Sequence, residues 1–236
     1  MITDPIFYQA DLSDNYLNED ESKHAIKVLR LNIGDSIVIT NGQRVWRYAT
    51  IFNPDFRKCE YQITNEIESP PLPYSIHLAI APTKNNERTE WMVEKLVETG
   101  IDSITFFHSS NSERSKLRLD RILKKAISAM KQSGQNYLPK IDGIVSFSEL
   151  IQKKEGAAEK YIAHIDENDY KTLSSSINKN SSYSILIGPE GGFSKKEIAQ
   201  AKEKGYQPVS LGKNRLRTET AGLTAIINLH IINQLN

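Results

Sequence analysis

The segment that most constrains the fold lies near the C-terminus, where an apolar run breaks into a glycine-rich loop and restarts as a helix. Residues 185–187 (Ile-Leu-Ile) are typical of a buried strand, and the Gly-Pro pair at 188–189 ends it. The glycines at 191 and 192 let the backbone bend freely. Ser194 and Glu197 then have the spacing of a capping box, which predicts that a helix opens there.

The same order of elements recurs closer to the C-terminus. Residues 209–211 form a second short apolar run, and the loop 212–217 that follows carries several positive charges. Thr218 or Thr220 can cap a final helix, whose apolar residues on one face are Leu223, Ile226, Ile227 and Ile231. Two consecutive strand–loop–helix junctions predict a ligand site at one edge of an α/β sheet.

Strand and helix patterns alternate from residue 74 to the C-terminus. Besides the two junctions, the predicted strands are 76–81, 101–107 and 161–165, and the predicted helices are 89–99, 117–132 and 147–154. This alternation predicts a mostly parallel sheet that is covered by helices on both faces. We interpret His77, His164 and His230, which fall within these elements, as packing residues.

The first seventy residues have a different pattern, dominated by short strands. Asn41-Gly42 separates the strand-like runs 36–40 and 44–51, which is a strong signal for a β-hairpin, and a third run covers 60–64. A helix capped by Asp20 or Ser22 is predicted to reach Arg30, and the turn-rich residues 1–20 are expected to wrap the surface. These signals predict a small β-meander or barrel with one helix.

A proline-rich segment at residues 69–73 interrupts both patterns. Its prolines predict a stiff, extended connector. We therefore expect a small domain at 1–70 and a larger domain at 74–236.

Composition excludes several classes of protein. Charged residues make up 25% of the chain and hydrophobic residues 39%, which is typical of a folded protein and not of a disordered one. The net charge of +1 gives no sign of a nucleic-acid partner. The single cysteine, Cys59, excludes an internal disulfide, and no Cys/His cluster has zinc-ligand spacing, so we expect no metal. No signal-like start and no run long enough to cross a membrane are present, which favours a cytoplasmic protein.

The loop 188–192 has neither common phosphate-binding signature. It lacks the Gly-Lys-Ser/Thr ending of a P-loop, and its glycines do not follow the G-x-G-x-x-G spacing of dinucleotide sites. Polyphosphate binding is therefore disfavoured. The loop is either a tight turn or a backbone edge that receives a flat, largely uncharged group.

Positive charge in the second loop has two interpretations. Lys213, Arg215 and Arg217 lie within five positions, close to Glu219. They form either a solvated loop with ion pairs to Glu219 or a site for an anionic partner. The second interpretation places such a partner beside the glycine loop.

Further basic residues follow two helical segments. Arg114 lies in the loop after the predicted strand 101–107, with Arg121, Lys124 and Lys125 on the next helix, and Lys23, Lys27 and Arg30 lie on the N-terminal helix. Charge runs on amphipathic helices are usually solvated faces. Cations near aromatics such as Trp46 also suit RNA, since phosphates bind the cations and bases stack on the rings.

The paired C-terminal motifs resemble those of a known family. Residues 211–221 (Leu-Gly-Lys-Asn-Arg-Leu-Arg-Thr-Glu-Thr-Ala) and 187–194 (Ile-Gly-Pro-Glu-Gly-Gly-Phe-Ser) closely resemble the ribosomal RNA small subunit methyltransferase E family. Further similarity lies at 24–30, 94–100 and 112–115, so the resemblance covers both predicted domains. This family methylates N3 of a uridine in 16S rRNA and belongs to the SPOUT class of S-adenosylmethionine-dependent enzymes.

The resemblance implies a fold and an assembly that the residue patterns do not predict. It implies a C-terminal SPOUT-type α/β domain with a deep trefoil knot, an N-terminal PUA-like β-barrel that binds RNA, and a homodimer with each cofactor near the subunit interface. The cofactor S-adenosylmethionine is then expected to contact Ile187, Gly188, Pro189, Glu190, Gly191, Gly192, Leu211, Gly212, Leu216, Arg217, Thr218 and Ala221.

The resemblance also implies roles in catalysis and RNA binding. Uridine N3 must lose its proton, so we expect Arg217 or Arg114 to stabilise the developing uracilate, with Glu219 either orienting the arginine or acting as the base. The expected contacts to 16S rRNA, either naked or in the assembled small ribosomal subunit, are Lys23, Lys27, Arg30, Lys84, Arg114, Arg121, Lys124 and Lys125. The alternatives are methylation of another RNA or of a ribose 2′-hydroxyl, and a non-catalytic RNA-binding protein of ribosome assembly.

Overall fold

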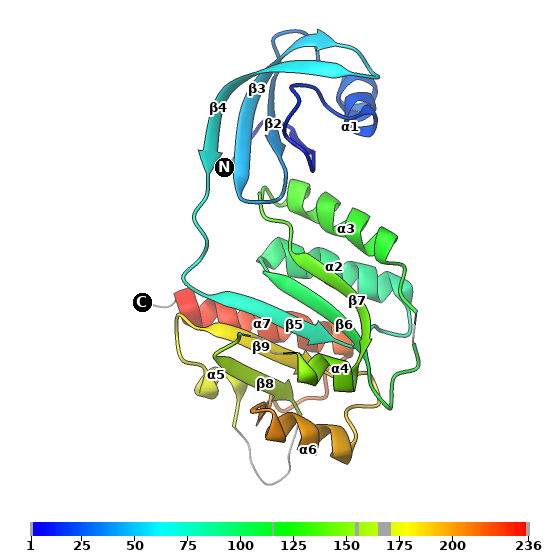
Figure 1. The fold of residues 1–236 in the computed structure, drawn as a ribbon, viewed down its shortest axis with the longest axis vertical. Coiled ribbons are helices and arrows are strands. Elements are labelled where there is room, and N and C mark those ends of the chain that lie inside the picture. The colour runs from blue at the N-terminus through cyan, green and yellow to red at the C-terminus, as the bar shows by residue number, and fades with distance from the viewer. Residues whose placement is uncertain (1, 115, 154–155, 165–170, 235–236) are drawn as a thin grey trace. The chain divides into compact units, whose positions relative to one another are not determined.

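The computed structural model describes residues 2–114, 116–153, 156–164 and 171–234. The chain forms two compact units, shown as ribbons in Figure 1. The first contains residues up to Pro71 together with Ile127–Leu138, and the second contains Leu72–Ala126 and the chain from Pro139 onward. The segment Ile127–Leu138 lies far along the sequence from the rest of the first unit, and the predicted range 1–70 does not include it.

The first unit is built on a four-stranded sheet. Its strands are β1 (Ile6–Tyr8), β2 (Ser36–Thr40), β3 (Val45–Pro54) and β4 (Cys59–Glu68), in spatial order β1-β2-β3-β4. The predicted hairpin is present, because β2 and β3 pair antiparallel on either side of Asn41-Gly42. Gly42 has φ +73°, and a Cβ there would lie 2.7 Å from Cβ of Leu138, so the turn requires glycine.

The start of the chain corrects one prediction. Residues 6–8 do not wrap the surface: they form β1, which pairs parallel with β2, and Phe7 is fully buried. Phe7 belongs to a core with Ile37, Ile51 and Tyr61. A strand of three residues is too short for its period to be recognised in the sequence.

The N-terminal helix also differs from its prediction. It consists of α1 (Glu19–Lys23) followed by a π-helical turn, η1 (His24–Val28). Asn18 caps it by accepting a hydrogen bond from the Glu21 N–H, in place of the predicted Asp20 or Ser22. The Ser22 hydroxyl instead donates to the Leu17 carbonyl and accepts from the Cys59 N–H, which joins the helix to β4.

The second unit contains a six-stranded parallel sheet. Its strands are β5 (Ser75–Ile80), β6 (Ser103–His108), β7 (Lys140–Ser146), β8 (Glu159–Ala163), β9 (Ser182–Ile187) and β10 (Gln207–Val209), in spatial order β10-β8-β9-β5-β6-β7. Every adjacent pair is parallel, as the alternating pattern predicts. Strand β7 was not predicted, because its polar residues and Gly143 weaken the strand signal.

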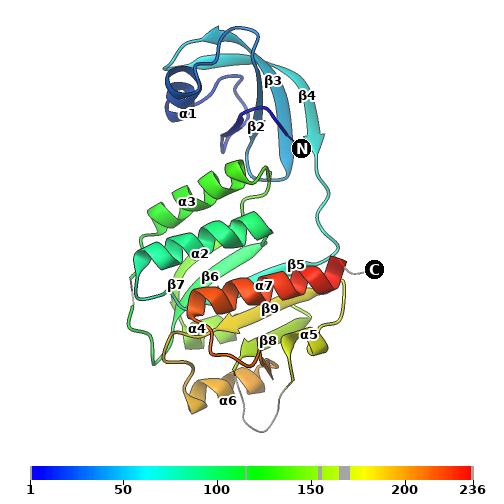
Figure 2. The same ribbon diagram turned by 180° about the vertical axis from the view of Figure 1, so that it is seen from behind.

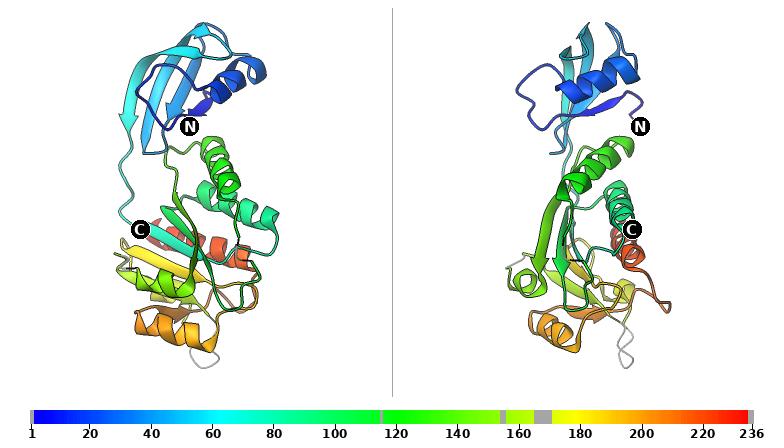
Figure 3. Two further views of the ribbon diagram at one scale, coloured as in Figure 1. Left: turned by 45° about the vertical axis from the view of Figure 1, so that its right-hand side comes forward. Right: turned by 90° about the vertical axis from the view of Figure 1, so that its right-hand side faces the viewer.

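Helices cover both faces of this sheet. The helices from residue 86 onward are α2 (Asn86–Thr99), α3 (Leu119–Gln132), α4 (Phe147–Gln152), α5 (Leu173–Ser176), α6 (Lys195–Glu203) and α7 (Thr218–Gln234), and α3 begins in the second unit and ends in the first. Helices α2 and α7 lie side by side on one face, whereas α4 and α6 lie on the other (Figures 2 and 3). Phe147 of α4 and Ala201 of α6 share a buried cluster with Phe107 and Leu186 of the strands. The structure thus confirms a parallel sheet with two covered faces.

The buried face of α7 is only partly the predicted one. Ile227 and Ile231 are 38% and 50% exposed, whereas the helix buries Ile226 together with Gly222, Ala225 and Leu229. A Cβ at Gly222 would lie 2.8 Å from Cδ1 of Ile80, so this face approaches β5 closely. Because α7 is apolar on nearly every side, its periodicity alone does not identify the face that packs on the sheet.

His230 is a buried packing residue, as predicted, whereas His77 is half-buried and hydrogen-bonded between two neighbouring strands. The Nδ1 atom of His230 lies 2.8 Å from the Tyr74 hydroxyl, and its Nε2 lies 2.5 Å from the Gly100 carbonyl. Burial lowers the pKa of His230, because it disfavours the charged imidazolium. The two ring nitrogens of His77 lie 3.1 Å and 2.9 Å from the hydroxyls of Ser184 and Thr105.

Candidate active site

A cavity of about 380 Å³ lies where the loops after β8, β9 and β10 meet. These loops follow the carboxyl ends of neighbouring parallel strands, which is the usual place for a ligand site in such a sheet. The lining residues are Ala163, His164, Ile187, Gly188, Pro189, Glu190, Gly191, Gly192, Phe193, Val209, Leu211, Gly212, Asn214, Arg215, Leu216, Thr218 and Ala221.

The structure gathers the sequence-predicted cofactor residues around this cavity, with one exception. All of them line it except Arg217, whose side chain lines a separate concavity described below. His164, which we interpreted as a packing residue, is half-buried and also lines the cavity. Its place at the end of β8 is decided by the strand order, which the sequence does not reveal.

Two hydrogen bonds connect the glycine loop after β9 to the basic loop after β10. The Thr218 hydroxyl donates to the Gly188 carbonyl at 3.2 Å, and Nη2 of Arg215 donates to the Glu190 carbonyl at 3.0 Å. The Glu190 carboxylate in turn accepts from the Lys84 N–H at 3.2 Å, which adds the loop after β5. The loops that form the cavity wall are therefore joined to one another by hydrogen bonds.

The glycine loop is held from behind by the segment after β6. The Asn111 side-chain amide donates to the carbonyls of Gly191 and Gly192 at 3.3 Å and 3.1 Å. A Cβ at Gly191 would lie 3.1 Å from Cβ of Asn111, and Gly192 has φ +71°. Close approach at one position and a left-handed backbone at the next explain why both residues are glycine.

Glu197 connects the same two segments. It completes the predicted capping box with Ser194 at the start of α6, and its carboxylate also accepts from the Ser110 N–H and hydroxyl, both at 2.9 Å. Burial by itself raises the pKa of Glu197, but the hydrogen bonds from Ser194 and Ser110 outweigh it and hold the pKa below its ordinary value. Glu197 is therefore a structural carboxylate that fixes the loop behind the cavity.

The candidate catalytic residues Arg217 and Glu219 line a second concavity, of about 440 Å³. Glu219 is buried, and its Oε2 atom has no hydrogen-bond partner among the described residues. Its Oε1 atom lies 3.9 Å from Nε of Arg88, which is within ion-pair range but too far for a hydrogen bond. The other lining residues are Asn85, Glu87, Trp91 and Thr220. Sequence reasoning missed Arg88 and Trp91, because they are distant in sequence from Glu219.

Arg114, the alternative catalytic arginine, lies elsewhere. It lines a concavity of about 620 Å³ with Lys84, Asn86, Glu113, Lys116, Leu117 and Arg118. A hydrogen bond from Lys84 to Glu113 raises the pKa of the Lys84 amine. Asn85 lines the concavity of Arg217 while its two neighbours line that of Arg114, so one loop borders both.

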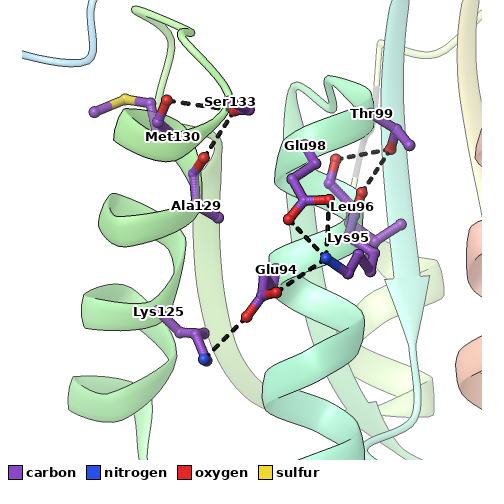
Figure 4. Close-up of polar contacts among 9 residues, drawn as sticks. All are labelled: Glu94, Lys95, Leu96, Glu98, Thr99, Lys125, Ala129, Met130 and Ser133. Atoms are coloured by element: carbon purple, nitrogen blue, oxygen red, sulfur yellow. Dashed lines mark hydrogen bonds and ion pairs between the residues drawn. The ribbon is translucent and has the colours of Figure 1, made fainter. Parts of the chain in front are cut away.

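Part of the predicted RNA-binding strip is paired with acidic residues. Arg121 of α3 lies 3.8 Å from Glu90, and Lys125 lies 2.9 Å from Glu94, both on α2 (Figure 4 shows the second pair). Hydrogen bonds from Lys125 and then Lys95 lower the pKa of Glu94. Lys124 is exposed. The strip therefore carries less uncompensated charge than its sequence suggests.

The predicted RNA contacts of the first unit lie on its N-terminal helix and the turn after it. Lys23 pairs with Glu19 at 2.6 Å, and Lys27 lies 4.0 Å from the centre of the Phe56 ring. Arg30 is exposed and has φ +59°, a left-handed conformation that ends the helical segment.

No group of three or more His, Cys, Asp or Glu side chains in the described ranges could hold a metal ion. Among the same residues, no helix is long and apolar enough to cross a membrane.

Comparison with known proteins gives the family. Residues 70–230 match an RNA methyltransferase domain, and residues 17–63 match an RNA methyltransferase PUA domain. The chain is 30% identical over 231 residues to ribosomal RNA small subunit methyltransferase E of Buchnera aphidicola, covering 93% of this chain and 88% of that protein.

Solved structures show the same fold over nearly the whole chain. A probable rRNA-methyltransferase from Porphyromonas gingivalis is 39% identical, with a TM-score of 0.91 over 97% of this chain and 98% of that one. A ribosomal RNA small subunit methyltransferase E from Neisseria gonorrhoeae, bound to S-adenosyl methionine, is 28% identical, with a TM-score of 0.85 over 97% and 98%. The chain therefore belongs to the ribosomal RNA small subunit methyltransferase E family, with a PUA domain followed by an RNA methyltransferase domain.

Proposed function

We propose that the protein transfers a methyl group from S-adenosylmethionine to N3 of a uridine in 16S rRNA. The observation that carries this proposal is the cavity between the loops 187–192 and 211–218, closed by the bond from Thr218 to Gly188. The similarity to the Neisseria gonorrhoeae enzyme, solved with S-adenosyl methionine, supports the choice of cofactor.

The residues of the cavity fit this cofactor. S-adenosylmethionine has no phosphates, and the glycine loop lacks a phosphate-binding lysine. Apolar side chains such as Ile187, Leu216 and Ala221 suit a flat adenine, while the backbone of the two loops supplies hydrogen-bonding groups. When bound, the cofactor supplies a methyl group that is already activated by its sulfonium.

The protein then has to deprotonate and position the uracil. N3 is a weakly acidic imide, and it must carry a lone pair in line with the methyl group. Arg217 or Arg114 stabilises the negative charge that develops on the uracil, and Glu219 orients the arginine or accepts the proton. Arg217 and Glu219 are adjacent in sequence to Leu216 and Thr218, which line the cavity. Their backbone therefore lies within about one or two Cα–Cα spacings of the cavity wall.

Recognition of the RNA is proposed to use both units. Lys23, Lys27 and Arg30 of the PUA domain, together with Lys84, Arg114, Arg121, Lys124 and Lys125, contact phosphates of 16S rRNA or of the assembled small subunit. The match to an RNA methyltransferase PUA domain and the basic concavity around Arg114 support this assignment. Action on ribosomal RNA also implies a cytoplasmic protein.

A knotted chain and a homodimer complete the proposal. Strand β10 pairs with β8 at the edge of the sheet, whereas α7 packs on β5 and β9, so the chain recrosses the sheet between them. This return supports the deep trefoil knot implied by the resemblance to the family. The exposed Ile227 and Ile231 of α7 support a dimer in which apolar side chains are covered. Light scattering of the purified protein tests the dimer.

Mass spectrometry of 16S rRNA tests the function. Purified small subunits are incubated with the protein and labelled S-adenosylmethionine, and the labelled nucleoside is identified. A label on uridine N3 supports the proposal. Primer extension separates the alternatives, because a methyl group on N3 blocks base pairing whereas one on a ribose hydroxyl does not. Absence of cofactor binding by calorimetry favours a non-catalytic RNA-binding protein.

A further inference from the structure

We propose that Arg88, Glu219 and Arg217 together read the Watson–Crick edge of the target uracil, with Glu219 as the base that takes the N3 proton. This inference rests on the proposed function and makes its mechanism specific. It assigns a role in recognising the base to Arg88, which lies outside the C-terminal sequence motifs. It gives Arg114 no contact with the reacting base.

Glu219 is a buried carboxylate with unused acceptor capacity. The residue is 6% exposed, Oε2 is fully shielded and without a hydrogen-bond partner, and Oε1 faces Arg88 Nε at 3.9 Å. Leaving a buried charged acceptor unpaired is costly, so such a group in a concavity is expected to meet a donor from a ligand. The ligand that carries this donor must be compact, because the concavity has a volume of about 440 Å³. It can enter from solvent, because Arg88 and Arg217 in the lining are exposed.

Uracil carries a hydrogen-bond donor, N3–H, between two acceptors. Its Watson–Crick edge presents the O2 acceptor, the N3–H donor and the O4 acceptor in a row. The residues that line the concavity include the complementary groups: two guanidinium donors, Arg88 and Arg217, and one carboxylate acceptor, Glu219. The same edge of cytosine has no proton at N3 and carries an amino donor beside it, so it would place a donor against an arginine and leave Glu219 unpaired.

Two helices begin at this concavity and favour the same chemistry. Asn85 caps α2, and α7 begins at Thr218, next to Arg217 and Glu219. The partial positive charge at both helix starts, added to the two guanidinium groups, stabilises an anionic uracilate. Trp91 lies one turn after Arg88 on α2, is 43% exposed and lines the concavity, so its ring offers a surface on which the base stacks.

The reaction step balances without a further reactant. The N3–H bond breaks and its proton moves to the Glu219 carboxylate, which leaves the negative charge on the uracil between the two arginines. The N3 lone pair then forms a bond to the methyl carbon while the carbon–sulfur bond breaks. The sulfonium becomes a neutral thioether, and the proton on Glu219 leaves to water after product release.

The experiment compares variants on two RNAs. Small subunits are reconstituted with 16S rRNA transcribed from uridine triphosphate or from 5-fluorouridine triphosphate, whose N3–H is more acidic and depends less on a base. Single-turnover rates with saturating labelled cofactor are measured for wild type, Glu219→Gln, Arg88→Met and Lys95→Met. Lys95 is the matched control, because it lies two turns beyond Arg88 on α2 and pairs with Glu94 and Glu98. Calorimetry of cofactor binding confirms that each variant is folded.

We expect Glu219→Gln to lower the rate of methyl transfer to uridine RNA by about 10²–10⁴-fold relative to wild type. On fluorouridine RNA the same variant is expected to lose less of the wild-type rate. Arg88→Met is expected to slow transfer by about 10- to 100-fold on uridine RNA, and Lys95→Met to match wild type. Equal losses of Glu219→Gln on both RNAs, or an Arg88→Met rate equal to that of Lys95→Met, would overturn the inference. If wild type methylates neither RNA, the proposed function itself fails, which is a separate result.

Discussion

The Thr218 hydroxyl donates a hydrogen bond to the Gly188 carbonyl at 3.2 Å, and this contact joins two loops that follow different strands. Gly188 directly follows β9, whereas Thr218 begins α7 after the chain has passed through α6 and β10. Both residues line the same cavity. The bond therefore couples the first turn of the C-terminal helix to the shape of the proposed cofactor site.

Loss of this hydroxyl is expected to weaken cofactor binding. Thr218→Val keeps the shape of the side chain but leaves the Gly188 carbonyl without its donor, which costs about 1 kcal/mol of unfolding free energy. Calorimetry should show weaker binding of S-adenosylmethionine, and urea denaturation should show the loss of stability. Thr224→Val, in the same helix but outside the cavity, is the control. Equal cofactor affinities for the two variants would argue against the coupling.

A methyl group at position 191 is expected to displace the glycine loop. The Cβ of Gly191→Ala would lie 3.1 Å from Cβ of Asn111, so the loop must move away from the segment that holds it. We expect a roughly tenfold loss of cofactor affinity, equivalent to about 1.4 kcal/mol. Gly143→Ala is a matched control, because the nearest atom to its Cβ is 3.9 Å away. Unchanged affinity in Gly191→Ala would show that the loop is not part of the site.

Arg217 is expected to act on turnover rather than on cofactor binding. Its side chain lies outside the cavity wall formed by its neighbours and lines the concavity of Glu219. Arg217→Ala should lower the rate by about 10²–10³-fold and leave the dissociation constant of S-adenosylmethionine largely unchanged. Single-turnover kinetics and calorimetry separate the two effects. A collapse of cofactor affinity with normal turnover at saturating cofactor would contradict this role.

Binding to rRNA is expected to fall steeply with salt, and two neighbouring lysines should contribute unequally. Lys124 is exposed, whereas Lys125 lies 2.9 Å from Glu94. Lys124→Gln should reduce the slope of log affinity against log salt by about 1, because one phosphate contact is lost. Lys125→Gln should reduce it less, since Glu94 already compensates its charge. Filter binding across a salt series measures both slopes, and a larger effect for Lys125 would exclude this explanation.

His230 is expected to make the protein less stable in mild acid. Burial lowers its pKa below the ordinary value of 6.5, so the unfolded chain binds a proton more readily than the folded one. The stability is complete above about pH 6.5 and is lost as the pH falls below that value toward the folded pKa. Denaturation at several pH values measures this, with His230→Gln as the variant that lacks the titration. An identical pH dependence in that variant would assign the effect to another group.

Local signals were sufficient for much of the fold. The Asn41-Gly42 turn, the capping box at Ser194 and the alternation that produces a parallel sheet are all present in the structure. Each depends on residues close together in the chain, where propensity and spacing act directly. The failures at β1 and at the face of α7 have the opposite cause, because a short strand and an evenly apolar helix offer no local pattern that selects a partner.

The sequence by itself determined the two loops that line the cavity, the absence of both common phosphate-binding signatures from the glycine loop and the resemblance to a family. Only the tertiary structure decided that Arg217 lines a separate concavity, that His164 lines the cavity and that Arg88 and Trp91 line the same concavity as Glu219. The order of strands in the sheet and the packing of α2 against α7 create these neighbours. Such contacts join residues far apart in the chain, and no local pattern encodes them.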